Sequence, residues 1–183
     1  FPGKLVAIRL NGLDSPELAA DIKAAERSLA DCFVLPKVES ASDLDPVVAK
    51  LPNPVLAMIE GPAGIYNARE IAAHAAVAGL IAGVNDICAD MGIKTGPNRE
   101  GLELALQSIV LAAAAACFQR HGFHGASMAE ISREAGMSVG HIYHYFANKE
   151  AIIAAIVAGD QQQILAIDDE IRSHDDWARA MVE

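Results

Sequence analysis

Short apolar runs alternate with helix-like stretches along the first hundred residues. Four runs are continuously apolar and end at turn residues: 4–10 (KLVAIRL), 31–38 (DCFVLPKV), 54–60 (PVLAMIE) and 79–86 (GLIAGVND). Continuous apolarity predicts strands buried on both faces, as in a parallel sheet. The segments between them predict helices over 15–30, 40–51 and 67–77, the first starting at Ser15 and Pro16. The pattern therefore predicts four consecutive βα units, about half of an eightfold barrel.

The rest of the chain predicts helices only. A long apolar helix over 105–123 (ALQSIVLAAAAACFQRHGF) is expected to stop at Gly122. Three later helices each follow a capping residue: Ser127, Ser138 and Asn148. Glu130 completes a capping box with Ser127, and Gly136 ends that helix. A helix, a glycine-containing turn and a second helix over 139–145 form the pattern of a helix-turn-helix motif.

Charge and cysteine content narrow the function classes. The 183 residues carry a formal net charge of −10, which argues against a sequence-independent electrostatic grip on nucleic acid or on an anionic membrane. Residues 110–158 are balanced, so the acidic excess lies outside them. Three widely spaced cysteines form neither a disulfide framework nor metal-ligand spacing. No apolar run approaches the roughly 20 residues of a membrane span, so we expect a cytoplasmic protein without a membrane partner.

Polar side chains follow each predicted strand: Arg9 and Asn11, Lys37, Glu60, and Asn85 and Asp86. Active sites of βα barrels gather at these carboxyl-terminal strand ends. The alternative is that polar residues end strands because loops are solvated. Glu60 and Asp86 follow neighbouring strands, and two carboxylates there can hold Mg²⁺ together with substrate oxygens and water. Arg9 can clamp a substrate carboxylate as a bidentate fork.

Five stretches of the first half follow one another in a family order: RLNGLDSPELAADI, VLPKVESASDL, PVLAMIEGPAGIYNAREIA, GLIAGVNDICADMGI and REGLELALQSIVLAA. They make residues 1–113 resemble the HpcH/HpaI aldolase and citrate lyase beta-subunit family. The resemblance implies a (β/α)₈ barrel that uses Mg²⁺ to cleave C–C bonds of oxo acids or acyl-CoA thioesters. It implies Arg9, with Asn11 beside it, for the substrate, and Glu60 and Asp86 for the metal. The family's first strand and the strands after its fifth are absent.

The stretch from AAAAACFQRHGF to YHYFANKEAIIAAI makes residues 110–158 resemble the DNA-binding domain of the tetracycline-repressor (TetR) family. The resemblance implies double-stranded DNA as the partner, with Val139, Gly140 and His141 at base edges. Phosphate contacts are implied for Ser127, Ser138, Tyr143, Tyr145 and Lys149. The basic residues that usually precede the first helix are absent, which weakens phosphate binding.

Other interpretations of this segment stay open. Small helical domains contain such turns without binding DNA, and the two tyrosines could be packing residues. The four histidines at 121, 124, 141 and 144 could suggest a metal site, but no carboxylate-rich shell accompanies them.

The two resemblances meet inside the helix predicted over 105–123, and we place the junction near residues 109–114. We predict a chimera of α/β plus all-α class: a partial TIM-type barrel over 1–109, a TetR-like three-helix domain over 110–158 and a helical tail over 159–183. DNA binding of the TetR type is the expected function. The alternatives are a Mg²⁺-dependent C–C lyase acting on an oxo acid or acyl-CoA, and a hybrid without selected activity. Pairing of two half-barrels at their open edges would give a homodimer.

Overall fold

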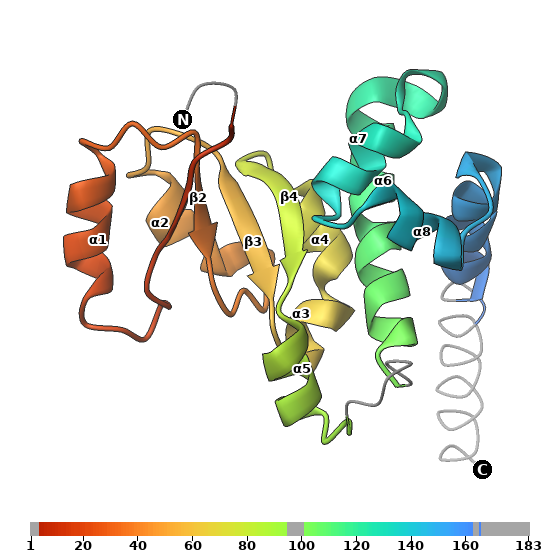
Figure 1. The fold of residues 1–183 in the computed structure, drawn as a ribbon, viewed down its shortest axis with the longest axis horizontal. Coiled ribbons are helices and arrows are strands. Elements are labelled where there is room, and N and C mark those ends of the chain that lie inside the picture. Colours follow the sequence, from red (N-terminus) through yellow and green to blue (C-terminus); the bar gives the residue numbers. More distant parts are fainter. Residues whose placement is uncertain (1–3, 95–100, 163–164, 166–183) are drawn as a thin grey trace, which may run out of the picture.

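The computed structural model describes residues 4–94, 101–162 and 165. Its centre is a parallel sheet with strand order β1-β2-β3-β4, so that spatial order follows chain order (Figure 1). The strands are β1 Ala7–Arg9, β2 Cys32–Leu35, β3 Val55–Ile59 and β4 Val77–Ala82. One strand lies in each predicted region, although β4 begins two residues before the run predicted for it. The predicted parallel sheet is confirmed.

Burial differs between the inner strands of the sheet and its β1 edge. All four residues of β2 are buried, and so are Val55, Ala57 and Ile59 of β3. Every residue of β1 is exposed, and the adjoining Leu5 is 67% exposed. In the part of the chain that the structure describes, β1 pairs with β2 alone, so its outer edge is open. The interior of the sheet is thus a core, and β1 is an apolar edge strand.

Short helices fill the connections between the strands: α1 Leu18–Ala25, η1 Ala41–Asp43, α2 Asp45–Val48, α3 Pro62–Tyr66, α4 Ala68–Ala73 and α5 Val84–Asp90. The start predicted for α1 was wrong by two residues, because Ser15 begins a turn and the helix is capped at Glu17 instead. Its hydroxyl oxygen accepts a hydrogen bond from the Glu17 N–H at 3.3 Å. Asp86, predicted at a strand end, lies in the first turn of α5, just beyond β4.

Helix α6, Glu103–Gly125, runs past the predicted junction of the two segments. Its small residues 112–116 are all buried alanines, which allows α4 and β4 to pack closely against it. Gly122 interrupts the helix with a φ of 70° and a ψ of 163°. The helix was predicted to stop at Gly122; it kinks there instead and continues for one more turn, to Gly125.

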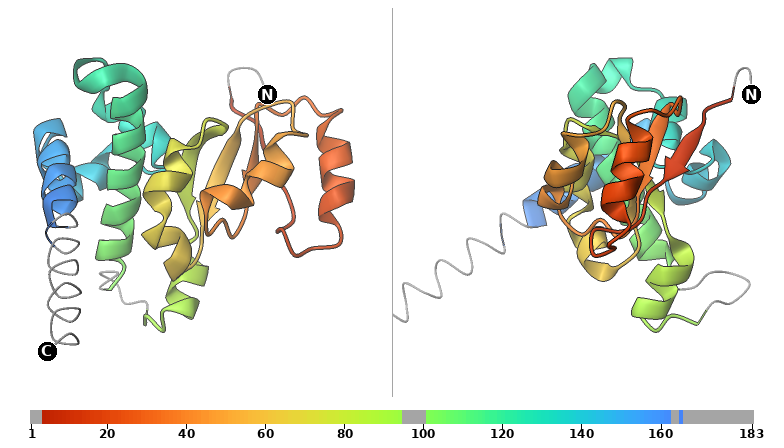
Figure 2. Two further views of the ribbon diagram at one scale, coloured as in Figure 1. Left: turned by 180° about the vertical axis from the view of Figure 1, so that it is seen from behind. Right: turned by 90° about the vertical axis from the view of Figure 1, so that its left-hand side faces the viewer.

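Helices α7 Met128–Glu134 and α8 Val139–Tyr145 follow α6, and residues 149–162 are helical. The capping box of Ser127 and Glu130 is confirmed, and the Asn148 side chain accepts from the Ala151 N–H at 2.8 Å. Seen from behind, α6 stands between the sheet and the helical residues 149–162 (Figure 2). Most of the predicted tail lies outside the described residues. No helix within the described ranges is long and apolar enough to cross a membrane.

Candidate functional sites

Glu60 is the buried centre of the strand-end cluster. It follows β3 directly and is only 4% exposed. Its Oε2 accepts a hydrogen bond from the Lys37 backbone N–H at 2.8 Å, and its Oε1 lies 3.7 Å from Nη2 of Arg9. Lys37 adopts a φ of 54°, in the left-handed region that non-glycine residues rarely occupy. The cluster thus holds a buried carboxylate between a backbone donor and a half-exposed guanidinium.

Asp86 adds a second carboxyl group to this cluster. Burial raises the pKa of Glu60 above the usual range of a glutamate, and the neighbouring Asp86 carboxyl raises it further, against the Lys37 N–H and the Arg9 charge. Gly83 makes room for Glu60, because an added Cβ would stand 2.4 Å from the Cγ of Glu60. The structure therefore brings the two predicted metal ligands together.

Asn11 does not join the cluster. Its backbone N–H and its side-chain amide both donate to Oδ2 of Asp21, at 2.7 and 2.8 Å, which ties the loop after β1 to α1. Arg9 instead lines a cavity of about 540 Å³ together with Ser15 and Lys37. The cavity is bordered by both cationic and acidic groups, and it opens where β1 and β2 end.

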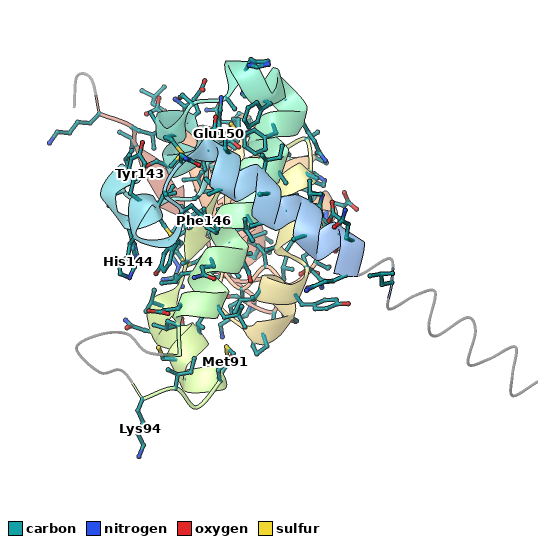
Figure 3. The ribbon with its side chains drawn as sticks, turned by 90° about the vertical axis from the view of Figure 1, so that its right-hand side faces the viewer. Met91, Lys94, Tyr143, His144, Phe146 and Glu150 are labelled. Atoms are coloured by element: carbon teal, nitrogen blue, oxygen red, sulfur yellow. The ribbon has the colours of Figure 1, made fainter. Side chains whose placement is uncertain are left out.

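Helix α8 exposes one side of its surface. The Ser138 side chain caps it, accepting from the His141 N–H at 3.2 Å. Ile142 is buried in the core, whereas Gly140 is exposed and Tyr143 is 50% exposed. Val139 is exposed as well, and Figure 3 shows His144 projecting from the outer side of the helix. The residues with predicted DNA contacts at 138, 139, 140 and 143 thus lie at the surface.

His141 and Tyr145 contact each other. Nε2 of His141 lies 3.0 Å from the Tyr145 hydroxyl oxygen, and the ring centroids are 5.2 Å apart. Both side chains are partly buried. The base-edge contact predicted for His141 and the phosphate contact predicted for Tyr145 would therefore come from one coupled pair.

Lys149 lies against the end of α6. Its ammonium group donates to the carbonyls of Phe123 at 2.5 Å and Ala126 at 2.8 Å, and it sits 4.4 Å from the centroid of the Phe123 ring. Cations near the carboxyl end of a helix satisfy its last carbonyls and interact favourably with its dipole. These bonds give Lys149 a structural role in addition to the phosphate contact predicted for it.

A further cluster of chemistry-bearing side chains was missed by the sequence analysis. Cys117, His121 and Glu134 place their ligand atoms within 4.8 Å of one another at the crossing of α6 and α7. Burial raises the pKa of the Cys117 thiol to about 11, and the neighbouring Glu134 charge adds to the rise. The i, i+4 spacing of Cys117 and His121 was visible in the sequence, but the third member comes from tertiary packing.

Two family descriptions match the chain. The HpcH/HpaI aldolase/citrate lyase family matches residues 3–122, and the bacterial regulatory proteins of the tetR family match residues 110–156. Since the first match covers well over half of the residues, the chain belongs to the HpcH/HpaI aldolase/citrate lyase family. The two matches overlap over 110–122, inside α6. The predicted chimera of two segments that meet in one helix is thereby confirmed.

Curated relatives divide in the same way. The (3S)-malyl-CoA thioesterase of Cereibacter sphaeroides is 38% identical over 109 residues, which are 59% of this chain and 38% of the thioesterase. The HTH-type transcriptional regulator UidR of Escherichia coli is 46% identical over 57 residues, which are 31% of this chain and 29% of UidR. The chain thus spans well under half of each relative.

Solved structures resemble the first segment. RipC from Yersinia pestis superimposes with a TM-score of 0.55 at 36% identity, covering 60% of this chain and 53% of RipC. The citrate lyase beta subunit from M. tuberculosis, complexed with oxaloacetate and magnesium, gives a TM-score of 0.54 at 27% identity, covering 60% of this chain and 50% of that subunit. The partial α/β fold of this family is therefore established for the first segment.

Proposed function

We propose that the chain is a DNA-binding hybrid, in which α7 and α8 form a helix-turn-helix on a sheet derived from an aldolase-like barrel. The observation that carries this proposal is the exposed side of α8, formed by Val139, Gly140 and Tyr143 next to the cap Ser138. A recognition helix needs such a side to enter the major groove, while its other side packs on the preceding helices. Ile142 supplies that packing side. The tetR-family match over 110–156 supports the same assignment.

The electrostatics of this surface favour modest affinity. Segment 110–158 contains three residues with fixed positive charge. Of these, Arg120 is paired with Glu134, and Lys149 is bonded to the carbonyls of Phe123 and Ala126. Arg133, in the last turn of α7, is exposed. Each phosphate that a cationic side chain neutralises steepens the dependence of DNA binding on salt. With few cations available, we expect a shallow salt dependence. Discrimination between DNA sequences should then come mainly from the side chains of α8.

Selection from a random duplex pool tests this proposal. The intact chain is incubated with the pool at about 50 mM salt, bound duplexes are enriched, and the affinity of the enriched duplex is measured by fluorescence anisotropy up to about 200 mM. Enrichment of one sequence family supports the helix-turn-helix function. A pool that stays random, without retention at the lowest salt, contradicts it.

A second candidate function rests on the strand-end cluster. We infer that Glu60 and Asp86 would hold Mg²⁺, since two adjacent carboxylates are the donors that this ion prefers. The ion would supply Lewis-acid polarisation of a substrate oxygen. Arg9 would bind the carboxylate of an oxo acid in the adjoining cavity, while the Lys37 N–H fixes Glu60.

Calorimetry tests the second candidate. Oxaloacetate is titrated into the protein with and without Mg²⁺, and into the Arg9→Gln and Lys23→Gln variants. Binding that needs Mg²⁺ and Arg9 but tolerates the loss of Lys23, which is exposed on α1, supports an oxo-acid site. Heats that are the same with and without Mg²⁺ contradict it. DNA selection and this titration are independent experiments, so a negative result in one does not contradict the function tested by the other.

We propose a homodimer that pairs through one edge of the sheet, whereas the sequence suggested pairing at both open edges. The outer edge of β4 faces the turn after α7, because an added Cβ at Gly136 would meet the Leu80 carbonyl at 2.4 Å. The apolar edge at β1, with Leu5 and Ile8, is the edge we propose for pairing with a second copy. Light scattering of the intact chain and of Ile8→Lys checks this: a dimer that the substitution dissociates supports the interface, and a monomer at tens of micromolar opposes it.

A further inference from the structure

Three potential metal ligands meet where α6 crosses α7. The thiol sulfur of Cys117, an imidazole nitrogen of His121 and a carboxylate oxygen of Glu134 all lie within 4.8 Å of one another. Cys117 and His121 share one face of α6, since residues four apart on a helix are neighbours. Cys117 is fully buried and Glu134 is 5% exposed, whereas His121 is exposed. The cluster is therefore anchored in the core and open to solvent on the histidine side.

Arg120 fixes the carboxylate of this cluster. Its Nη2 lies 2.5 Å from Oε2 of Glu134, and its Nη1 donates to the Ala72 carbonyl in α4 at 3.4 Å. Partners of this kind orient a ligating carboxylate and hold it before a metal arrives. The guanidinium also offsets part of the negative charge that a thiolate and a carboxylate would bring together.

We propose that Cys117, His121 and Glu134 form a binding site for a zinc-class transition-metal ion. In proteins, Zn²⁺ is bound by thiolate, imidazole and carboxylate groups. A site with three protein ligands leaves the fourth tetrahedral position to water. The thiolate selects against Mg²⁺ and Ca²⁺, which take oxygen ligands. The site is therefore separate in position and in chemistry from the carboxylates of Glu60 and Asp86. A bound ion would link α7 to α6.

The binding step exchanges a proton for a metal bond. The Cys117 thiol loses its proton to solvent as the Sγ–metal bond forms, and no electron is transferred. His121 binds as the neutral imidazole and Glu134 as the carboxylate. Affinity therefore increases with pH.

The proposal is tested by titrating Co²⁺ into the intact chain, after the chain has been reduced and freed of metal by a chelator. Co²⁺ serves as the probe because a thiolate ligand gives it a near-ultraviolet charge-transfer band. We expect this band to saturate at one ion per chain and to disappear when Zn²⁺ displaces the probe. The Cys117→Ser variant should lose the band, whereas Cys88→Ser, which removes a buried thiol of α5, should keep it.

The exposed histidines provide a second pair of variants that do not disturb the core. His121→Ala should weaken Co²⁺ binding at least tenfold, since losing even a partner of a ligand costs about 10–100-fold. His124→Ala, three residues further along α6 and also exposed, should leave it unchanged. Absence of a thiolate band at excess Co²⁺, or equal behaviour of the two histidine variants, would overturn the assignment. In thermal unfolding, Zn²⁺ should raise the melting temperature of the intact chain, and no rise would contradict the proposed site.

Discussion

A Cβ added to Gly136 would stand 2.4 Å from the carbonyl oxygen of Leu80, so the turn between α7 and α8 lies directly against the backbone of β4. Gly79 makes the reciprocal approach, since its added Cβ would meet the Glu134 carbonyl at 2.9 Å. Ile131 and Ile142 share one core cluster with Leu80. The two family segments are therefore packed against each other.

Gly136→Ala should destabilise the whole chain. Gly136 has a φ of 62°, which disfavours any side chain, and the Leu80 carbonyl cannot move without disturbing the sheet. Overpacking of this kind costs about 1–3 kcal/mol, which urea denaturation would measure. Gly140→Ala is the matched control, because it lies in α8 with nothing within 4 Å of its added Cβ. Equal stability of the two variants would show that the turn does not contact the sheet as described.

Arg120→Met should lower the free energy of unfolding, because Arg120 is the cationic partner of the buried Glu134 carboxylate. The substitution leaves that carboxylate without its partner in the core, and breaking a buried pair costs about 3–5 kcal/mol. Because the Arg120 side chain is 36% exposed, we expect a smaller loss, about 1–3 kcal/mol. Adding Glu134→Gln to the same chain should recover part of the loss. A double variant that is less stable than Arg120→Met would contradict this account.

Glu60 should make stability depend on pH. Its pKa is raised in the folded state, first by burial and then by Asp86, so the folded state binds more protons than the unfolded state above the ordinary pKa of a glutamate. Stability should therefore fall as the pH rises from that ordinary value through the raised one. Glu60→Gln still accepts the Lys37 N–H and should lack this fall. Urea denaturation of both proteins between pH 4.5 and 7.5 would measure the difference, and parallel pH profiles would contradict it.

Lys149→Met should lower stability as well as DNA affinity. The substitution removes two hydrogen bonds to the Phe123 and Ala126 carbonyls, and losing a charged donor costs about 1.5–3 kcal/mol for each bond. Because this side chain is partly exposed, we expect the lower end of that range for each bond, about 3 kcal/mol in total. Lys50→Met, at an exposed position after α2, should have no effect. An unchanged melting temperature for Lys149→Met would instead favour a role in phosphate contact alone.

Local features of the fold could be predicted from the sequence because local chemistry fixes them. The apolar runs located all four strands, and Ser127 with Glu130 fixed the start of α7. Lys149 could not be assigned in this way, because its partners Phe123 and Ala126 lie more than 20 residues earlier in the chain.

The candidate sites show the same limit. Glu60 and Asp86 were predictable because parallel strands bring their carboxyl ends to one edge of the sheet. Asn11 also lies just beyond a strand, β1, but its side-chain amide donates to Asp21, a residue of α1 that the strand pattern does not locate. The grouping of Glu134 with Cys117 depends on how α7 crosses α6, which no local pattern encodes.

Fluorescence anisotropy with the enriched duplex tests the central claim most directly, comparing the intact chain with Tyr143→Ala and Tyr66→Ala. Tyr143, on α8, is 50% exposed, and Tyr66, at the end of α3, is 85% exposed, so neither substitution should disturb the core. We predict that Tyr143→Ala weakens binding about tenfold, in line with about 1–3 kcal/mol for a DNA contact, while Tyr66→Ala binds like the intact chain. Equal affinities for all three proteins would contradict the assignment of α8 as the recognition helix.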